Sequence, residues 1–588
     1  MKNIYIKFLL LLSLLATSCK LDGDLIDPNN PGTSGTDPNL VMNTIQLEFG
    51  DFYYRISNIV DPLVRMQSMD AGTTYLTAYR AASQDQAWIR GYASVLSNIQ
   101  LLKGILEPVI EKQHFDTHWA VAEIIEAYTY LTLVDVFGDI PQSEALSQNN
   151  YNPKYDKSSD VYDYAIGLLV DARGKLNSVA KNIEDEKPET LLSRDIYFNR
   201  SNAKWLALAN SLELKAWVNI SIIPDRKSEA DKKISTFITD TGSPVKGVDL
   251  IDTEAENFTY KYGTADNPTS SRHPWYDQNY RPSRGSAAGY LGTYFLHEVF
   301  GKWDKNNFNK VGNVVQDPRW RYYFYRQIGT VSPALGNFDA NGFSCAPGFG
   351  NAPTSYQLWT GSGATWNGPV FCVFEPGFWG RDHGNATGGP PDGNLITCFG
   401  VYPAGGRLDV ASALPSNYHV GVARGDGANG AGIVPIYMSF FTDFLVAEIL
   451  ARRSADAKDK FLTAVNNSID QVRNFASSKG QTLPSGIEPS QLRYTTLLGK
   501  QYDEESVKMD LIAKEAWISM FGNGVEAYNL YRRTSAPRFF QPLALATNQL
   551  FMRVLPYSQR SVTTNSSAPK SSVANTRVFW DTNTDILN

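Results

Sequence analysis

Cysteine is scarce in this chain, which has only four cysteines among its 588 residues. Three of them, Cys345, Cys372 and Cys398, lie far apart in a spacing that fits no CxxC metal pattern. They allow either one disulfide with one remaining thiol or three buried thiols. The sequence therefore predicts neither a disulfide framework nor a cysteine metal site.

A surplus of charge of one sign is also absent. The chain has 54 basic and 60 acidic residues, so it lacks the strongly basic field that attracts nucleic acid. The apolar run at residues 8–15 is too short to cross a bilayer core of about 30 Å. A hydrophobic fraction of 43% and a charged fraction of 19% exclude a disordered chain and a multi-span membrane protein. We expect a large globular protein with two or more lobes.

The N-terminal segment has the parts of a secretory signal peptide. Lys2 and Lys7 precede the apolar run, and residues 16–19 then read Ala-Thr-Ser-Cys. Small residues ending in a cysteine resemble the cleavage box of bacterial lipoproteins, although Ala16 stands where leucine is usual. We predict that cleavage makes Cys19 the lipidated N-terminus. An ordinary signal peptide with a chance cysteine is the alternative.

The residues after Cys19 are rich in proline, glycine and polar side chains, which cannot bury a core. We expect them to form a flexible tether. Asp22 and Asp24 resemble the signal that sends such lipoproteins to the outer face of the outer membrane. The expected location is therefore the outer membrane, with a lipid-anchored body that faces the cell exterior.

Apolar residues recur every three or four positions over much of the chain from residue 40 to 225. The stripe of Trp88, Tyr92 and Leu96 is typical of a helix with one buried face. The segment Gly-Asp-Ile-Pro at residues 138–141 separates two such helices, because glycine ends a helix and a following proline prevents its continuation. Helix pairs in series predict a mostly α protein with a tetratricopeptide-like solenoid lobe.

The middle of the chain has a different composition. Residues 331–432 hold nearly half of the 45 glycines and few charged residues. Half of the 12 tryptophans lie between positions 275 and 379. Turn-forming dipeptides are dense there, which predicts an irregular, loop-rich lobe. The tryptophans at helical spacing are instead expected to pack the solenoid, and these are Trp88, Trp119, Trp205, Trp217 and Trp517.

These shifts in composition predict six segments along the chain. The helical parts flank the loop-rich lobe, and loop-rich segments lie at both ends. The expected segments are a signal peptide at 1–18, a tether at 19–39, a helical lobe at 40–230, a loop-rich, aromatic-rich ligand-binding lobe at 231–434, a second helical part at 435–535 and a loop-rich C-terminal segment at 536–588.

Residues 515–537 read EAWISMFGNGVEAYNLYRRTSAP. They resemble the helix, glycine turn, Glu-Ala-Tyr and Arg-Arg-Thr-Gly-x-Pro run of the SusD/RagB family of nutrient-binding outer-membrane lipoproteins, with Ser535 where glycine is usual. The resemblance covers the signal and nearly the whole mature chain. Further matches follow in family order at 128–141, 153–162, 204–212, 317–319, 447–448, 555–557 and 579–581.

The resemblance implies four tetratricopeptide units, an irregular lobe and a lid-like role over a SusC-like, TonB-dependent outer-membrane channel. It also implies a binding protein and not an enzyme. Within the matched run, we expect Arg532 and Arg533 to form ion pairs with Glu526 and Glu515 at a helix end, which is a structural role.

The aromatic loops suit ligand binding. Sugar rings stack their C–H faces on indole or phenol rings while planar polar groups bind the hydroxyls, and peptides use the same rings together with charge. Residues 380–384, Gly-Arg-Asp-His-Gly, also resemble one nutrient-binding branch of the family. Each candidate has a structural alternative as a core residue. The candidate ligand contacts are Trp275, Tyr276, Tyr280, Arg281, Tyr290, Trp359, Trp366, Trp379, Arg381 and His383.

Catalytic and metal motifs are incomplete. His114 and His118 have the spacing of a zinc-binding helix, but Phe115 replaces the expected glutamate. Residues 581–585 begin like a calcium loop, yet Ile586 replaces the required glycine. We predict no catalytic residue, no metal and no cofactor.

The preferred hypothesis is a surface lipoprotein that captures an oligosaccharide and delivers it to the channel. Three alternatives remain open: a peptide-binding member of the same family, a secreted glycan hydrolase, and a purely structural lid. A hydrolase would need paired carboxylates at glycosidase spacing.

Overall fold

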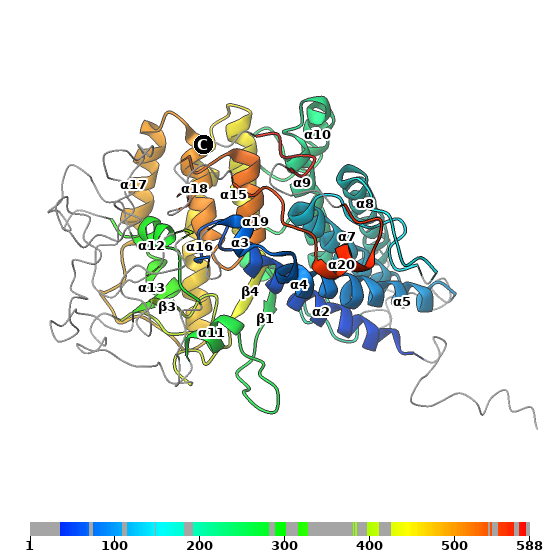
Figure 1. Cartoon of the computed structure of the whole chain (residues 1–588). Helices are drawn as coiled ribbons and strands as arrows, with labels where there is room; N and C mark the ends of the chain where they lie inside the picture. The colour runs from blue at the N-terminus through cyan, green and yellow to red at the C-terminus, as the bar shows by residue number, and fades with distance from the viewer. Residues whose placement is uncertain are drawn as a thin grey trace, which may run out of the picture.

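The computed structural model shows a mostly helical protein (Figure 1). The N-terminal helices, blue to cyan in Figure 1, lie on one side, and the C-terminal helices, yellow to orange, lie on the other. This confirms the predicted mostly α, solenoid-like class. The structure describes residues 36–69, 74–108, 115–147, 149–181, 192–280, 289–300, 315–326, 380, 383–384, 397–410, 425–538, 541, 543, 551–569 and 576–583.

The N-terminal helices pack in sequence order, α7 on α8 and α8 on α9. The chain between residues 81 and 106 is almost continuously helical and includes a π-helical segment, η4. The elements of this part are α2 (Pro38–Val60), α3 (Tyr75–Ala78), η3 (Ala81–Gln84), α4 (Asp85–Ile89), η4 (Arg90–Leu96), α5 (Ser97–Leu106), α7 (Asp116–Phe137), α8 (Ser158–Lys181), α9 (Asn202–Ile220), η7 (Pro224–Arg226) and α10 (Lys227–Ile234).

Helix α7 is the centre of the N-terminal part. Almost every residue from Thr117 to Phe137 is buried, because α2, α5, α8 and α9 all pack against this helix. The sequence predicted a single buried stripe, but α7 is buried on all of its sides. A helix that is largely apolar all round is expected in such an interior position. Gly138 ends the helix with a φ of 81°, as the glycine–proline turn predicted. Asp139 then accepts a hydrogen bond from the N–H of Ser158 at the start of α8.

Short elements lie between the two helical parts. Strand β1 pairs with β4 and strand β2 with β3, both antiparallel, so each small sheet joins segments that are distant in sequence. The elements are η8 (Glu254–Glu256), β1 (Phe258–Lys261), α11 (Pro274–Asn279), α12 (Thr293–Phe300), α13 (Trp320–Tyr323), β2 (Phe324–Arg326), β3 (Thr397–Phe399) and β4 (Ile433–Tyr437).

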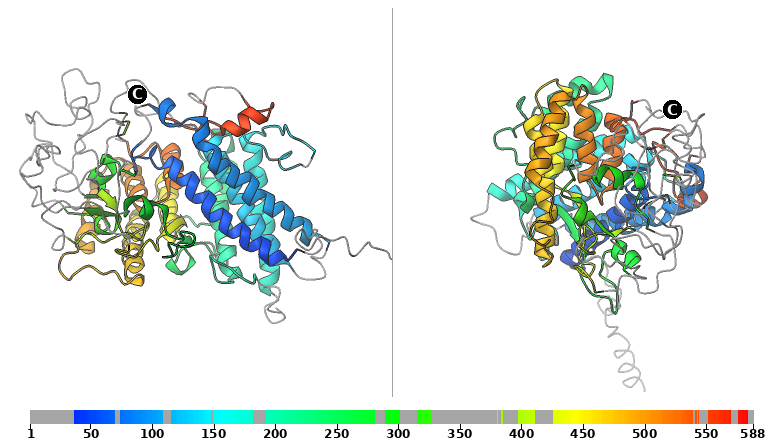
Figure 2. Two further views of the ribbon diagram at one scale, coloured as in Figure 1. Left: turned by 60° about the horizontal axis from the view of Figure 1, so that its bottom comes forward. Right: turned by 90° about the vertical axis from the view of Figure 1, so that its left-hand side faces the viewer.

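The C-terminal helices form a second bundle in which α15 packs on α16 and α18. Helix α19 packs back on α2 and α7 and so joins this bundle to the N-terminal part. Figure 2 shows the two bundles from two further directions. The helices are α15 (Ser439–Arg452), α16 (Lys458–Ser478), α17 (Gln491–Glu504), α18 (Lys508–Ser519), α19 (Gly524–Thr534) and α20 (Gln559–Thr564).

The expected pairing of Arg532 and Arg533 with Glu526 and Glu515 is wrong. Arg532 donates to Asn529 at 2.6 Å and to the carbonyl of Arg553 at 2.7 Å, and the other three pair with distant segments. Arg533 contacts both oxygens of Glu448 on α15, at 2.7 and 2.8 Å. Glu515 contacts Arg319 at 2.8 Å, and Glu526 pairs with a lysine of α9. All six side chains of these three pairs are almost fully buried. The run therefore ties helices together, because a buried charge is stable only when it is paired.

The tryptophans at helical spacing differ in burial. Trp119 is half-buried, and its indole N–H donates to Glu123 at 2.8 Å. The other four are buried as predicted, and these are Trp88, Trp205, Trp217 and Trp517.

Candidate ligand-binding site

Four tyrosines from three segments of the chain form a small cluster apart from the main core. We call Tyr276, Tyr280, Tyr290 and Tyr325, together with the buried thiol of Cys398, the tyrosine cluster. The rings of Tyr276 and Tyr280 stack with centroids 4.8 Å apart and an interplanar angle of 12°. Tyr325 continues the row at 6.3 Å from Tyr280. The helix α11 and the β2–β3 sheet position these rings.

Hydrogen bonds fix the phenol groups of this row. The hydroxyl of Tyr280 donates to the carbonyl of Phe399 at 2.5 Å and accepts from the N–H of Arg407 at 3.0 Å. The hydroxyl of Tyr276 accepts from the N–H of Gly425 at 2.7 Å. Backbone groups of two later segments therefore hold the rings in place.

An ion pair of moderate exposure lies at one end of the cluster. The guanidinium of Arg407 lies over the ring of Tyr325, with Cζ 4.7 Å from the centroid. Its Nη1 is 3.6 Å from Asp426, and the two side chains are 38% and 37% exposed. At the other end, Arg272 lies over Tyr276 at 5.7 Å. Such cation–aromatic contacts stabilise the ring orientation. The side chain of Arg407 stays partly open to solvent, whereas that of Arg272 is only 8% exposed.

The titratable groups of the cluster are held in neutral forms. Burial raises the pKa of Tyr280 well above its ordinary value, and burial raises the pKa of Tyr325 to about 12 despite the opposing effect of Arg407. Burial also lowers the pKa of His273, which precedes α11, to about 3. At neutral pH the cluster therefore consists of uncharged rings with charge only at its ends, which suits an uncharged ligand better than an ionic one.

Several stretches of the chain outside the described residues begin or end at this cluster. Residues 281–288 connect Tyr280 to Gly289, which precedes Tyr290. Residues 327–379 follow the strand of Tyr325, and residues 411–424 end just before Gly425, which binds Tyr276. The cluster is therefore where the glycine-rich and tryptophan-rich stretches join the described part of the chain.

The structure brings three of the predicted contacts together, since Tyr276, Tyr280 and Tyr290 all belong to the tyrosine cluster. Trp275 belongs to the main core and not to the cluster. Its ring stacks on Phe399 at 4.2 Å with an interplanar angle of 16°. All four side chains are at most 2% exposed, so none of them presents an open ring face to a ligand in the described arrangement.

His383 lies away from the cluster, in the interior beside α3. Its Nε2 is 3.1 Å from the hydroxyl of Tyr75, and its backbone N–H donates to Gln541 at 3.2 Å. Burial and the nearby Arg65 hold the pKa of its imidazole well below the usual range. The predicted lipidation site, Cys19, lies outside the described residues. The same is true of the remaining predicted ligand contacts, which are Arg281, Trp359, Trp366, Trp379 and Arg381.

Sequence reasoning missed three members of the site, Tyr325, Arg407 and Asp426. Tyr325 belongs to an aromatic run at residues 320–325, Trp-Arg-Tyr-Tyr-Phe-Tyr, which was a usable signal. No such signal marks Arg407 and Asp426, because each lies in a glycine-rich stretch without an aromatic or charged motif that points to a site.

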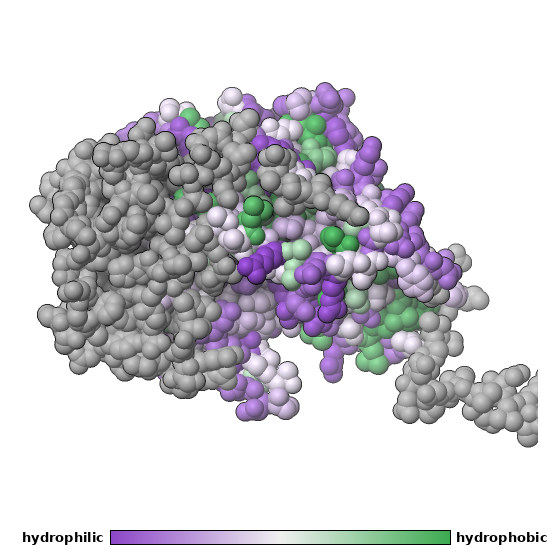
Figure 3. Space-filling model, viewed as in Figure 1, coloured by the Kyte–Doolittle hydropathy of each residue, from purple (hydrophilic) through white to green (hydrophobic). Residues whose placement is uncertain are grey.

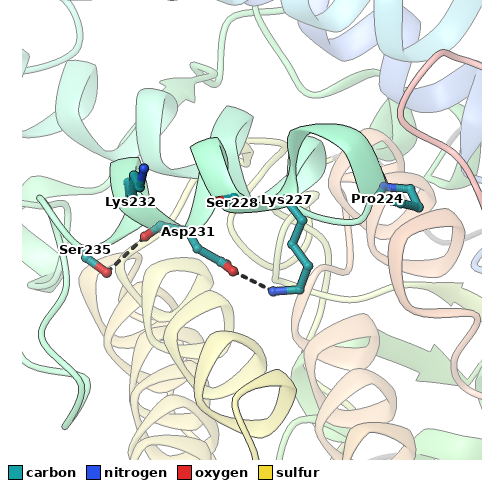
Figure 4. Close-up of a pocket in the computed structure, with 6 residues that line it drawn as sticks. All are labelled: Pro224, Lys227, Ser228, Asp231, Lys232 and Ser235. Carbon is teal, nitrogen blue, oxygen red and sulfur yellow. Dashed lines mark hydrogen bonds and ion pairs between the residues drawn. The ribbon is translucent and has the colours of Figure 1, made fainter.

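Two other hollows in the described residues are weaker candidates for a ligand site. A shallow groove on α10 is lined by Lys227, Asp231 and Ser235, and Figure 4 shows that these groups already satisfy one another. The Nζ of Lys227 contacts Asp231 at 2.5 Å, and the Ser235 hydroxyl donates to the Asp231 carbonyl at 2.9 Å. A cavity of about 20 Å³ beside Lys215 and Arg533 has room for about one water molecule. The described surface viewed in Figure 3 is mostly hydrophilic.

Metal-binding groups and membrane-spanning helices are both absent from the described part of the chain. It contains no group of three histidine, cysteine or acidic side chains arranged to hold a metal ion. None of its helices combines the length and the hydrophobicity of a membrane-spanning segment.

The described residues define a mostly helical protein with a small tyrosine cluster beside its main core. A sequence profile of the SusD-like family, described as "starch-binding associating with outer membrane", matches residues 30–343, which is more than half of the chain. The chain therefore belongs to the SusD-like family. Nutrient binding in association with the outer membrane is supported at the level of this family.

Solved structures with the same fold cover nearly the whole chain. A SusD/RagB family protein from Bacteroides thetaiotaomicron matches with a TM-score of 0.60 and 15% identity, over 94% of this chain and 100% of its own. A chitin-binding protein matches with a TM-score of 0.58 and 18% identity, over 93% and 100% of the two chains.

A third solved structure is a chitin-binding SusD homologue from Flavobacterium johnsoniae. It matches with a TM-score of 0.55 and 16% identity, over 93% of this chain and 98% of its own. At such identities the similarity establishes the fold alone. No curated protein sequence matches the chain.

Proposed function

We propose that this protein is a lipid-anchored cell-surface receptor that captures an oligosaccharide and delivers it to a SusC-like, TonB-dependent outer-membrane transporter without cleaving it. The tyrosine cluster carries this proposal. Its stacked, uncharged rings lie where the tryptophan-rich stretches join the described part of the chain. The rings are themselves at most 4% exposed, so they are proposed to support the site, and the aromatic faces that stack on sugar are proposed to come from the adjoining tryptophans.

The predicted contacts divide into two groups under this proposal. The buried tyrosines are proposed to fix the points where the glycine-rich and tryptophan-rich stretches join the described part of the chain. Trp359, Trp366 and Trp379 are proposed to stack on sugar rings. Arg407 and Asp426 are proposed to bind hydroxyl groups, because a guanidinium donates and a carboxylate accepts in fixed planes. The family match supports this reading, since nutrient binding is its common property.

The N-terminus supplies the proposed anchor. Several acyl chains on Cys19 would hold the protein at a membrane, whereas one chain binds only marginally. The 17-residue separation of Cys19 from Thr36, where the description begins, corresponds to a coil of roughly 20–25 Å. The body would thus stay within reach of a channel in the same membrane.

Binding by the purified mature protein tests the capture step. Calorimetric titration with maltooligosaccharides, chitooligosaccharides and mixed peptides should give binding to a glycan and no release of shorter products. Binding of peptides alone would replace glycan with peptide as the ligand, and release of shorter glycans would overturn the non-enzymatic role. A triple variant, W359A/W366A/W379A, should lose glycan binding while its melting temperature stays unchanged.

Membrane placement is tested in cells. The wild-type protein should incorporate a palmitate analogue, remain with outer membranes and be cleaved by protease added to intact cells. The Cys19→Ala variant should lose the label and leave the membrane fraction. An unchanged distribution of the variant would contradict the lipid anchor, and co-purification with a barrel protein would support delivery to a channel.

A further inference from the structure

A second group of tyrosines lies at the surface between α2 and β1. The ring of Tyr260 lies flat against α2 at Gly50, because a Cβ at that glycine would be 2.2 Å from Cδ2 and 2.5 Å from Cγ of the ring. Glycine inside a helix costs about 1 kcal/mol relative to alanine. Glycine at position 50 therefore makes α2 less stable than alanine would, but it leaves room for the ring of Tyr260.

Two more rings hold Tyr260 in place. Tyr262 lies perpendicular to it, with centroids 5.1 Å apart and an interplanar angle of 85°. Tyr54 on α2 lies edge-on to Tyr262 at 6.4 Å. All three side chains are half-buried, so the rings are fixed on one side and reach solvent on the other. We call Tyr54, Tyr260 and Tyr262 the α2 tyrosine patch.

Planar charged groups border the α2 tyrosine patch. Arg55 contacts Asp51 at 2.8 Å, and Arg90 contacts Asp51 at 2.9 Å and Glu48 at 2.8 Å. These side chains are between 27% and 36% exposed. Burial, Asp51 and Glu48 together raise the pKa of Tyr260, which places both carboxylates near the ring. Two cations and two anions leave the border with no net charge.

A chain of aromatic contacts links the patch to the tyrosine cluster. Tyr262 lies 4.8 Å from His273, and His273 lies 5.4 Å from Trp275 on α11, the helix that also carries Tyr276. The segment between β1 and α11 projects from the body in Figure 1. Its Arg272 lies over Tyr276. The ring contacts of the patch thus reach Trp275 on α11, and the next residue of that helix, Tyr276, belongs to the tyrosine cluster.

We infer that the α2 tyrosine patch is a second subsite for neutral sugar units of a long glycan chain whose other end occupies the site at the tyrosine cluster. The inference rests on the proposed function. A flat ring held from behind, with guanidinium and carboxylate groups at its edge, offers stacking and hydroxyl binding together. The absence of net charge at the border favours a neutral glycan over an acidic or basic peptide.

The experiment compares glycan lengths. Maltooligosaccharides and chitooligosaccharides from the disaccharide upward are titrated into the wild type, Tyr260→Ala and Tyr260→Phe. We expect Tyr260→Ala to weaken the binding of long chains about tenfold, equivalent to about 1.4 kcal/mol, and to leave the binding of short chains unchanged. Tyr260→Phe should keep wild-type affinity, because the ring remains.

The matched control is Tyr151→Ala, which removes a tyrosine that is 83% exposed on the loop before α8 and should change nothing. Equal affinity of Tyr260→Ala and wild type for long chains would overturn the second subsite while leaving the proposed function intact. Failure of the wild type to bind any neutral glycan would overturn both. A change in oligomeric state or in channel binding, with glycan affinity unaltered, would assign the patch to a protein contact instead.

Discussion

Charged groups in the C-terminal bundle and charged groups at the tyrosine cluster differ in burial and in pairing. Arg319 and Glu515 are fully buried and 2.8 Å apart. Arg407 and Asp426 are more than a third exposed and 3.6 Å apart. The first pair is part of a closed network, in which Arg319 also donates to Ser519 at 2.6 Å. In the second pair, Arg407 also lies over the ring of Tyr325, and both side chains remain partly open to solvent.

The difference shows which charges fix the fold and which are available to a ligand. A buried pair is held by every neighbour, and loss of one partner leaves an uncompensated charge in the interior. An exposed pair contributes little to stability and gives up its contact easily. Charge in this protein therefore has two uses, and the two are separated in space. Substitutions in each region test that separation.

The largest effect is expected in the buried network. Arg319→Met should lower the free energy of unfolding by about 3–5 kcal/mol, because it leaves Glu515 buried without its guanidinium partner. Burial opposes ionisation, yet Lys514 and Arg319 hold the pKa of Glu515 below its usual range. Denaturant titration measures the loss.

Arg407→Met is the matched control for this prediction and should cost less than about 0.5 kcal/mol. If Arg319→Met does not accumulate as folded protein, Tyr494→Phe replaces it. That variant removes a hydrogen bond to Glu515 at 3.0 Å and should cost about 1–3 kcal/mol. Equal losses in the buried and exposed variants would contradict the comparison.

A buried carboxyl with no cation beside it gives the next largest effect. Asp61 is 0% exposed, its Oδ2 accepts from Gln67 at 3.0 Å, and no described group donates to its Oδ1. Burial raises its pKa to about 8 despite the Gln67 hydrogen bond. In the unfolded chain the pKa is about 4. Between these values Asp61 binds more protons in the folded state, so its contribution to stability is greatest below pH 4 and falls as the pH rises to 8.

Asp61→Asn should remove this pH dependence. The N-terminus of α19 lies against Asp61 and stabilises its charged form in part, so we expect a gain on the order of 2–4 kcal/mol at pH 8 and little change at pH 4. Thermal melts of both proteins across this range measure the difference. Asp171→Asn, at a carboxylate that is 59% exposed, is the control. Parallel pH profiles for wild type and Asp61→Asn would disprove the assignment.

The exposed pair should respond in binding and not in stability. Arg407→Ala is expected to weaken glycan binding about tenfold, because one charge-assisted set of hydrogen bonds is lost. The probes are the maltooligosaccharides and chitooligosaccharides of the capture experiment. Arg560→Ala removes an exposed arginine on α20 and should leave affinity unchanged. A lower melting temperature for Arg407→Ala with unaltered affinity would move Arg407 to the scaffold.

The same comparison explains what could be predicted from the sequence. Helical spacing and the glycine–proline turn indicated the helices around Gly138, because both act within a few residues. The partners of the buried charges could not be predicted, since Glu515 and Arg319 are 196 positions apart. Long-range pairing depends on the packing of whole helices, and one sequence does not show it.

The candidate site was predictable only in its residue types. Trp275 and Tyr276 are neighbours with similar side chains, yet one stacks on Phe399 in the main core and the other belongs to the tyrosine cluster. Composition identified both as aromatic residues of the loop-rich part. Which side of α11 each one occupies depends on the strands that pack there. At Ser535 the local backbone could be predicted, because the family pattern has glycine there and Ser535 adopts a left-handed φ of 54°.

The smallest effect concerns backbone shape in the bundle. Ser454, in the exposed turn between α15 and α16, has a φ of 56°, which is strained for a residue with a Cβ. Ser454→Gly should stabilise the protein by about 0.5–1 kcal/mol, because relief of this strain exceeds the entropy that glycine adds to the unfolded chain. The matched control, Ser178→Gly in the regular helix α8, should lower stability by a similar amount. Changes of the same sign in the two variants would show that the turn of Ser454 is not strained.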